Sequence, residues 1–287
     1  MFNTIRENIE RTLGIERKIK PSRKGATVEG ISEFSGRFKS WRGNEKLNNY
    51  PFVENTYAPF TPLQRALPML NLALITSAGA YIDGTEPFDL EAKDGDLNFR
   101  EIPVEVEAAD LLYSAKGYDP TAVKTDRNSQ IPVDRLMEYE ANGVIGRLNN
   151  VWWSLSSYIP NAALVASDLA PRIADRLVHY EVQAALLVPA SRLCHQTLGI
   201  IARTIEERGI PTMLLSVDRT VTDKIRAPRT AYYDGKIGEV VGEPNWKQYQ
   251  LRVLDEAIRW IETLDQPASK KLTVDLETEI EASRGER

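Results

Sequence analysis

The chain has 287 residues, of which 42% are hydrophobic and 27% charged, and its formal net charge at neutral pH is −5. This composition is typical of a globular protein with a sizeable core and excludes a low-complexity chain. The longest apolar stretches, near Leu72 and Ala184, are much shorter than the roughly 20 residues of a membrane-crossing helix, and the first residues lack a signal peptide's apolar core. We therefore expect a cytoplasmic protein without membrane contact.

The first 70 residues carry a net positive charge, whereas the rest of the chain carries a net negative charge. Residues 1–70 contain twelve Lys and Arg against seven Asp and Glu, and four of these basic residues lie within 18–24. No aromatic residues are interleaved with them and no nucleic-acid-binding motif is present, so we expect no nucleic-acid partner. A short helical pattern, Thr4 to Leu13, precedes loop-rich sequence. The range 1–70 is predicted to wrap around a domain.

Residues 71–160 predict a first α/β lobe. In chain order the predicted elements are an apolar strand at 72–75, strands at 102–106 and 110–114, a helix from Pro132 to Asn142, and a mixed aromatic run from Ile145 to Ser157. The helix is bounded by a proline at its start and by an Asn-Gly pair at its end, which are the usual signals for these positions.

Residues 161–264 predict a second α/β lobe, and 265–287 a charged tail that is either a surface helix or partly disordered. The predicted elements are a helix at 161–180, a strand at 184–190, a helix ending at Gly209, a strand at 212–217 and a last helix at 246–264. The two strand patterns are too short for helices and are bounded by Pro189 and Pro211. They predict a strand–helix–strand crossover.

The alternation of strands and helices predicts an α/β fold with a mainly parallel sheet and flanking helices. We expect Rossmann-like or flavodoxin-like units arranged in one or two lobes. The sequence has no Gly-x-Gly-x-x-Gly and no Gly-Lys-Ser/Thr motif, and its single cysteine, Cys194, precludes a Cys-rich zinc cluster and an internal disulfide. We therefore expect no cofactor and no metal.

Cys194 is the leading candidate for chemistry. It follows the first strand of the crossover, where the turn opens at the carboxyl edge of the sheet, the edge at which open α/β folds bind ligands. The positive end of the following helix favours a thiolate, which makes Cys194 a candidate nucleophile. The alternative is a small core residue. His195 is interpreted as a base or substrate ligand, or as a capping or core histidine, and Ser191 as a binding residue, a substitute nucleophile or a turn residue.

Small residues also end the first strand of the chain. Thr76, Ser77 and Gly79 allow backbone N–H groups to approach an anion, which makes them candidate substrate-binding residues. A tight turn without a ligand is the alternative interpretation.

A second group of candidates lies in loops. Asp119, Asp126 and Asn128 share one loop in which two carboxylates can meet for acid–base work, or can simply form turns. Arg100 and Arg229 each lie beside a proline-bearing turn and are candidate anchors for a substrate carboxylate.

Several motifs in a shared order resemble one enzyme family over roughly residues 55–260. They are Pro59-Phe-Thr-Pro62, Leu72-Ala-Leu-Ile-Thr-Ser-Ala-Gly79, Pro87-Phe-Asp89, Gly95-Asp96, Arg100-Glu-Ile-Pro103, Tyr118-Asp119, Asp126-Arg-Asn128, Pro132-Val-Asp-Arg-Leu136, Gly143-Val-Ile-Gly146, Cys194-His-Gln196 and Gly209-Ile-Pro211. Together they are similar to the glycine/sarcosine/betaine/D-proline reductase selenoprotein B family. The resemblance implies a substrate-activating subunit of an amino-acid reductase, which cleaves a carbon–nitrogen bond with a selenocysteine or cysteine nucleophile.

One departure from the family pattern bears on the chemistry. The family's reactive chalcogen stands three residues before a cysteine, and this sequence has Ser191 there, so Cys194 has no internal redox partner. The histidine-rich stretch that the family has near Tyr118-Asp119 is also absent.

The sequence leads to three hypotheses about function. One is a reductase-like enzyme that acts on a small amino acid or a related amine or thio compound through Cys194, with an external thiol or redox partner protein. The second is lyase- or isomerase-type proton transfer using Cys194 with Asp119 or Asp126. The third is a non-catalytic subunit of a homo- or hetero-oligomeric complex.

Overall fold

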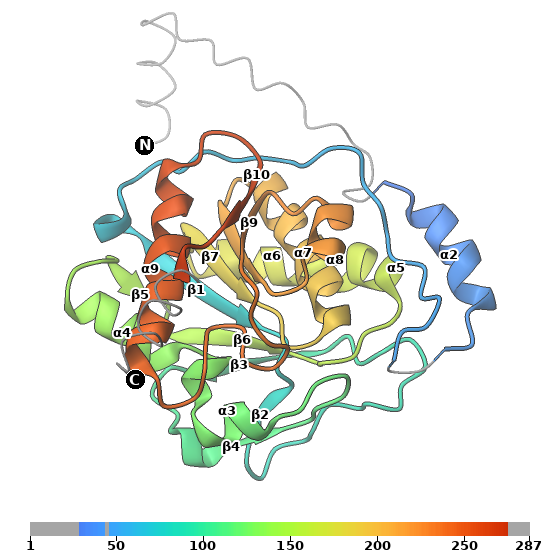
Figure 1. The fold of residues 1–287 in the computed structure, drawn as a ribbon, viewed down its shortest axis with the longest axis horizontal. Coiled ribbons are helices and arrows are strands. Elements are labelled where there is room, and N and C mark those ends of the chain that lie inside the picture. The colour runs from blue at the N-terminus through green and yellow to red at the C-terminus, as the bar shows by residue number, and fades with distance from the viewer. Residues whose placement is uncertain (1–28, 44–45, 275–287) are drawn as a thin grey trace, which may run out of the picture.

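The computed structural model describes residues 29–43 and 46–274, and these form an α/β fold around one large sheet (Figure 1). The predicted helix Thr4 to Leu13 and the basic residues of 18–24 lie outside this part. The strands of the large sheet are β1 (Asn71–Thr76), β3 (Phe99–Pro103), β5 (Arg147–Leu148), β6 (Val151–Leu155), β7 (Ala184–Val188), β8 (Thr212–Ser216), β9 (Arg229–Tyr232) and β10 (Ala268–Lys271). A separate antiparallel pair joins β2 (Ala80–Ile82) to β4 (Leu111–Tyr113).

The strand order is β10-β9-β8-β7-β1-β6-β3, with β5 paired to β1. Every pairing in this sheet is parallel except that of β3 with β6. The run β6-β1-β7-β8-β9 has the 2-1-3-4-5 order of flavodoxin-like folds. The predicted α/β class with a mainly parallel sheet is confirmed.

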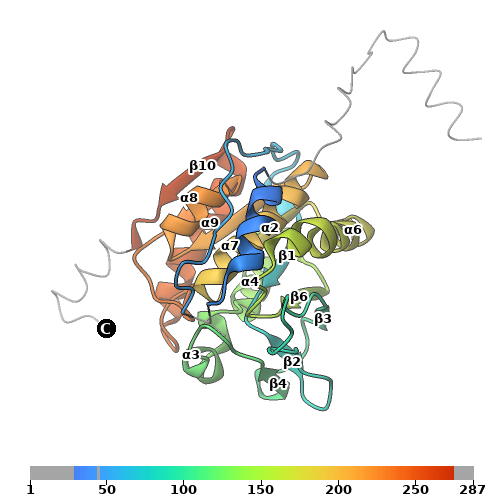
Figure 2. The same cartoon turned by 90° about the vertical axis from the view of Figure 1, so that its right-hand side faces the viewer.

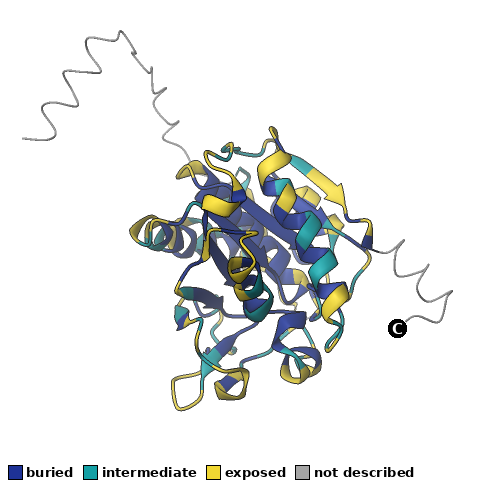
Figure 3. Cartoon of the chain, turned by 90° about the vertical axis from the view of Figure 1, so that its left-hand side faces the viewer, coloured by how far each residue is buried: buried dark blue, intermediate teal, exposed yellow. Residues whose placement is uncertain are grey.

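Apolar strands explain why the sheet lies between two layers of helices. All six residues of β1 are buried, and alternate side chains enter different cores: Leu72 and Leu74 pack on one face, Ala73 and Ile75 on the other. A strand buried on both faces reads as a continuous apolar run, which is the pattern of a parallel sheet. Figure 3 shows the strands as a buried layer beneath more exposed helices.

The helices divide between the two faces. One face is covered by α4 (Val133–Ala141) and α9 (Lys247–Thr263), and the other by α6 (Ala170–His179), α7 (Arg192–Glu207) and α8 (Arg219–Ile225), with α2 (Ile31–Ser40) packed outside them (Figures 1 and 2). The short helix α3 (Thr121–Thr125) lies near β2 and β4. The predicted crossover is present as β7, α7 and β8.

Several elements differ from the sequence expectation. The strand expected at 102–106 is β3, and α8 and β9 lie between 217 and 246, where no element was expected. The helix expected over 161–180 consists of a short turn, α5 (Ala162–Leu164), a π-helical turn at 165–169 and α6. The start of the tail, expected as a surface helix or disordered, forms the edge strand β10, since residues 268–271 pair with β9 and place Leu272 and Val274 in the core. The remainder of the tail from 275 lies outside the described residues.

Strands from both predicted lobes belong to the same sheet. β1 and β6 come from 71–160, β7, β8 and β9 come from 161–264, and β1 pairs directly with β7. The described part of 1–70 runs over the outside of these elements, with the backbone N–H of Asn55 bonded to Lys224 O at 2.9 Å.

Candidate functional site

The strand order creates a switch point at the carboxyl ends of β1 and β7. From β1 the chain passes to β6 on one side, whereas from β7 it proceeds to β8 on the other. Ligands of open α/β sheets bind at such a point, because the connections diverge there and leave a crevice. Residues that follow β1, β6 and β7 meet here: Ser77, Ser157 and Ser191.

Ser191 and Cys194 are in direct contact at this edge. Ser191 caps the start of α7, since its Oγ accepts a hydrogen bond from the backbone N–H of Cys194 at 3.2 Å. The same oxygen lies 3.0 Å from Cys194 Sγ and 3.2 Å from Ser157 O. Cys194 Sγ in turn lies 3.2 Å from Ser157 O and 3.7 Å from Ser77 O. Two strand ends and one helix start therefore converge on a single thiol.

Burial governs the protonation of that thiol. Cys194 is only 1% exposed, and desolvation raises its pKa, although hydrogen bonds involving Ser191 and Ser77 oppose the rise. The helix start was expected to favour a thiolate, and in this enclosed conformation burial acts in the opposite direction on the pKa of Cys194. The carbonyl oxygens of Ser77 and Ser157 face the sulfur. They can accept a hydrogen bond from the protonated thiol, but they repel a thiolate.

His195 faces away from Cys194 and fastens α7 to the end of β8. Its Nδ1 lies 2.8 Å from Ser191 O, and its Nε2 accepts from the backbone N–H of Val217 at 3.2 Å. These contacts define the neutral tautomer with the proton on Nδ1. Burial lowers the pKa of His195 to about 4. Because both nitrogens are engaged by backbone groups, the structure shows a core histidine rather than a base for Cys194.

The three candidates at the end of β1 have separate environments. Ser77 belongs to the cluster: its carbonyl faces Cys194, and its Oγ accepts from the backbone N–H of Ala190 at 3.2 Å. Gly79 has a φ of 68°, and its N–H donates to Leu155 O at 2.9 Å, so this N–H is not free for an anion. Thr76 is buried with its Oγ1 unpartnered among the described residues.

A loop spanning 114–118 covers the cluster. The backbone N–H of Lys116 donates to Ser157 Oγ at 2.8 Å, and Tyr118 Oη donates to Ala78 O at 2.6 Å. Burial raises the pKa of Tyr118, and the nearby Cys194 raises it further. Gly117 lies beside Ser191, since a Cβ on it would be 3.5 Å from Ser191 Cβ. With Ser191 and Cys194 each 1% exposed, the site is enclosed.

Sequence reasoning missed Ser157, Lys116 and Tyr118 as parts of this site. Ser157 follows a strand that ends at the same sheet edge as β1 and β7, so the rule that placed the turn before Cys194 at a ligand-binding edge applies to it equally. Lys116 and Tyr118 carry no such signal, because a loop path over the site depends on tertiary packing.

The loop carboxylates do not meet. Asp119 is exposed, and its Oδ1 accepts from the N–H and hydroxyl of Thr121, which lowers its pKa. Asp126 accepts bonds on both oxygens, from Asn128 on Oδ1 and from Gln250 and Asn245 on Oδ2. Burial opposes ionisation of Asp126, but these bonds outweigh it and its pKa is lowered. The placement corrects the expectation of a carboxylate pair.

Asn128 completes a structural network with Asp134. Its Nδ2 bonds Asp134 Oδ2 at 2.7 Å, and its Oδ1 accepts from the backbone N–H of Asp134 at 3.1 Å. Arg127 binds both oxygens of the same carboxylate. These bonds hold a loop to the start of α4 and engage both Nδ2 and Oδ1 of Asn128.

The two candidate arginines lie elsewhere. Arg229 begins β9, at the amino edge of the sheet opposite Cys194, and it pairs with Glu206 at 2.5 Å, both side chains being fully buried. Arg100 lies on the edge strand β3, stacks 4.5 Å from the centre of the Phe88 ring and donates to Glu86 O at 3.3 Å. The contacts of both guanidinium groups lie outside the Cys194 cluster.

Residues 29–43 and 46–274 were also compared with the requirements of a metal site and of a membrane-spanning helix. This part of the chain contains no group of three or more His, Cys, Asp or Glu side chains placed to hold a metal. None of its helices combines the length and apolar character that a bilayer crossing requires.

Fold and site together define an open α/β protein of flavodoxin-like strand order, with a serine–cysteine pair at the switch point. The sequence model of the glycine/sarcosine/betaine reductase selenoprotein B family matches residues 42–190, just over half of the chain. The chain belongs to this family, as the sequence motifs indicated.

Characterised relatives share modest identity. The D-proline reductase subunit gamma of Acetoanaerobium sticklandii is 28% identical over 214 residues, which is 74% of this chain and 87% of the relative. The glycine reductase complex component B subunit gamma of Symbiobacterium thermophilum is 29% identical over 183 residues, or 60% of this chain. The sarcosine reductase complex component B subunit beta of Peptoclostridium acidaminophilum is 24% identical over 208 residues.

The match covers these relatives to different extents. The aligned part spans 40% of the glycine reductase subunit and 46% of the sarcosine reductase subunit, less than half of each. No solved structure matches this chain significantly. All three relatives are named as parts of amino-acid reductases.

Proposed function

We propose that this chain is a subunit of an amino-acid reductase complex and acts on a small amino acid or a related amine or thio compound through Cys194. The observation that carries the proposal is the contact of Ser191 Oγ with Cys194 Sγ at 3.0 Å, at the switch point of the sheet. Membership of the reductase family and the names of the relatives support the reaction class.

The reaction requires two electrons from outside the chain, because Cys194 is its only cysteine. The Cys194 thiolate attacks the carbon that bears the leaving amine or thiol; a C–S bond forms, and the leaving group departs with the bonding pair and gains a proton. A thiol of an external dithiol then attacks Sγ, and the carbon leaves with the C–S electrons and is protonated. The second donor thiol resolves the mixed disulfide, which regenerates Cys194 and leaves the donor oxidised.

Access is the first requirement of this mechanism. Since the loop 114–118 encloses the thiol, a substrate reaches Cys194 only after Lys116 and Tyr118 release Ser157 and Ala78. Opening admits water and removes the desolvation that raises the pKa of the thiol. The start of α7 then favours the thiolate, so opening and activation are coupled.

The test is the pH dependence of iodoacetamide alkylation of Cys194 in the folded protein, alone and with a panel of amino acids and a dithiol. We expect slow alkylation in the free protein, with an apparent pKa above the ordinary value of about 8.5. A substrate is expected to protect the thiol, or to lower the apparent pKa by opening the loop. Ser191→Ala should change the rate, and Ser167→Ala, on an exposed helix position, should not.

A non-catalytic subunit is the second candidate, and it is favoured by the enclosure of Cys194 and by serine at position 191. A thiol that stays inert with every amino acid, with the dithiol and with partner subunits would overturn the enzymatic proposal and support this one. The lyase- or isomerase-type alternative finds no support in the geometry, because Asp119 and Asp126 bond to other groups and not to the Cys194 cluster.

A further inference from the structure

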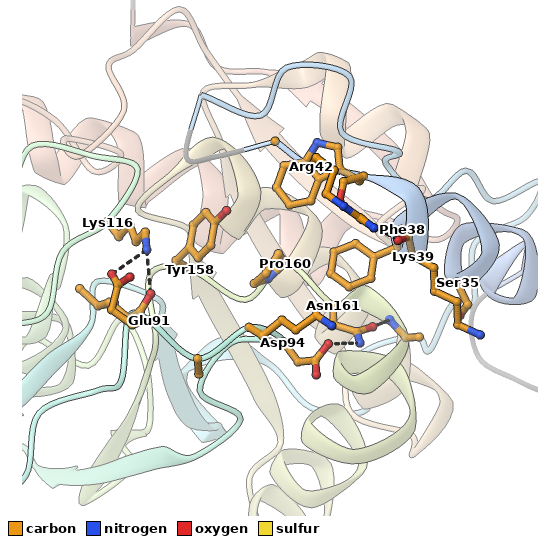
Figure 4. Close-up of a pocket in the computed structure, with 16 residues that line it drawn as sticks. Ser35, Phe38, Lys39, Arg42, Glu91, Asp94, Lys116, Tyr158, Pro160 and Asn161 are labelled. Carbon is orange, nitrogen blue, oxygen red and sulfur yellow. Dashed lines mark hydrogen bonds and ion pairs between the residues drawn. The ribbon is translucent and has the colours of Figure 1, made fainter.

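A pocket of about 790 Å³ is lined in part by Lys116, a residue of the loop that covers Cys194 (Figure 4). Its walls come from α2 and the residues after it, from 90–94, from Lys116 and from 158–163. Lys116 and Tyr158 are shared with the enclosed site: the Lys116 backbone bonds Ser157, and Tyr158 follows Ser157 directly. The pocket therefore backs onto the candidate site without opening into it.

The pocket is rich in cationic groups. Four basic side chains line it, Lys39, Arg42, Lys93 and Lys116, against two carboxylates, Glu91 and Asp94. Glu91 is paired with Lys116 at 2.9 Å, and Asp94 accepts from Asn161 Nδ2 at 2.8 Å. Within the described residues, Lys39, Arg42 and Lys93 have no carboxylate at ion-pair distance. Arg42 Nη1 donates to Lys39 O at 2.7 Å and to Trp41 O at 2.9 Å. Among the described residues, the lining therefore carries more cationic than anionic side chains.

The same pocket has an aromatic lining. Phe38 and Trp41 stack with ring centres 6.0 Å apart on the α2 side, and Tyr158 lies across the pocket, with Lys116 Nζ 4.9 Å from its ring centre. Figure 4 shows Phe38 and Lys39 on one side, Tyr158 and Lys116 on the other. Aromatic walls with a few placed charges are typical of pockets that orient an organic ligand.

We propose that this pocket binds an organic anion that carries an aromatic ring. The lysines and Arg42 hold the acidic group, and the ring packs against Tyr158 or the Phe38–Trp41 wall. The pair of Lys116 with Glu91 is weak because the Glu91 side chain is 89% exposed, and Lys116 Nζ is held in place by a second bond to Leu90 O at 2.8 Å. The proposal does not depend on any reaction at Cys194, since binding alone tests it.

The experiment is isothermal titration calorimetry of the full chain with three matched probes. The probes are 3-phenylpropionate, propionate, which keeps the acid without the ring, and 3-phenylpropylamine, which keeps the ring with opposite charge. We expect 3-phenylpropionate to bind roughly tenfold or more tightly than either comparator, because it alone satisfies both features of the pocket. Failure of 3-phenylpropionate to bind, or equal binding of a comparator, overturns the proposal.

Two variants test whether 3-phenylpropionate binds in this pocket. Lys93→Met and Trp41→Leu, both at partly or fully exposed positions, should weaken binding by roughly threefold to tenfold. Lys270→Met on β10, outside the pocket lining, is the matched control and should leave binding unchanged. Equal weakening by the control, or unchanged binding in both pocket variants, overturns the proposal. Thermal unfolding of each variant establishes that it is folded.

Discussion

The hydroxyl of Ser191 has two structural roles. It caps α7 and also contacts Cys194, so its removal affects both helix stability and the environment of the sulfur. Loss of an N-cap serine typically costs about 1 kcal/mol. A change in Cys194 reactivity in Ser191→Ala therefore has to be compared with the stability of the same variant before it is assigned to chemistry.

Gly79 follows β1 and packs closely against the backbone of Ser114. A Cβ there would overlap the carbonyl oxygen of Ser114, and the φ of 68° also disfavours an L residue. We expect Gly79→Ala to lower the free energy of unfolding by roughly 3 kcal/mol or more, measured by urea denaturation. Gly84→Ala has similar strain, with a φ of 80°, but open space around it, and should cost only about 1 kcal/mol. Equal losses would show that the overlap with Ser114 is relieved cheaply.

His195 predicts a pH dependence of stability. Its folded pKa of about 4 lies below the usual 6.5, so between these values the unfolded state binds more protons. The stabilising contribution is therefore present above pH 6.5 and is lost as pH falls towards 4, with an upper limit on the order of 3 kcal/mol. Urea denaturation from pH 7 to pH 4 should give a flatter profile for His195→Gln than for the wild type. His179→Gln, at an exposed position, should keep the wild-type slope; an unchanged slope in His195→Gln would contradict the prediction.

At the scale of the element, α7 is fixed at both ends by polar contacts. Its start is held by Ser191 and His195. Near its end, the Glu206 carboxylate accepts from Arg229 Nη1, from the backbone N–H groups of Thr61 and Thr212, and from the Thr212 hydroxyl. Arg203, from the same helix, donates to Tyr57 O at 2.6 Å. The crossover thus has its candidate chemistry at one sheet edge and its anchoring ion pair at the other.

Arg229→Met is predicted to destabilise the fold strongly. It leaves the Glu206 carboxylate buried without its counter-charge, and loss of one partner of a buried pair typically costs about 3–5 kcal/mol. Urea denaturation should show this loss, whereas Arg208→Met, which breaks the exposed pair with Asp175, should change stability by less than about 0.5 kcal/mol. A cost for Arg229→Met as small as that of the surface variant would show that the pair contributes little.

The sequence predicted the crossover well because its signals are local. Proline residues bound the two apolar runs, and helical periodicity lies between them, so β7, α7, β8 and the position of Cys194 follow from neighbouring residues. Ser77 and Ser191 were each predicted as candidate binding residues, and the pairing of β1 with β7 brings them to one edge. Arg229 and Asp126 were misplaced because their partners, Glu206 and Gln250, are distant in sequence. The rise in the pKa of Cys194 was also inaccessible, since it depends on a covering loop.

At the scale of the molecule, one sheet joins the ranges 71–160 and 161–264 through the pairing of β1 with β7. The edge strand β10 extends this sheet and sets Leu272, 2% exposed, into the same core as Trp152. A shared core favours a single cooperative transition, whereas two independent lobes would unfold separately.

Leu272→Ala tests this continuity. We expect a loss of about 2–4 kcal/mol, and coincident urea transitions by tryptophan fluorescence and far-ultraviolet circular dichroism in both the wild type and the variant. Met69→Ala, at a position 63% exposed, is the control and should shift the midpoint little. Transitions that separate, with only one of them moved by Leu272→Ala, would support two lobes.

The enclosure of the only thiol provides a natural reporter of motion. Because Cys194 is 1% exposed, a reagent reaches it only while the site is open. At low reagent concentration the labelling rate therefore measures the open fraction, and at high concentration it reaches a plateau at the rate of opening. No engineered label is needed, because no second cysteine competes. Any ligand or subunit that shifts the plateau is thereby identified as changing the rate at which the site around Cys194 opens.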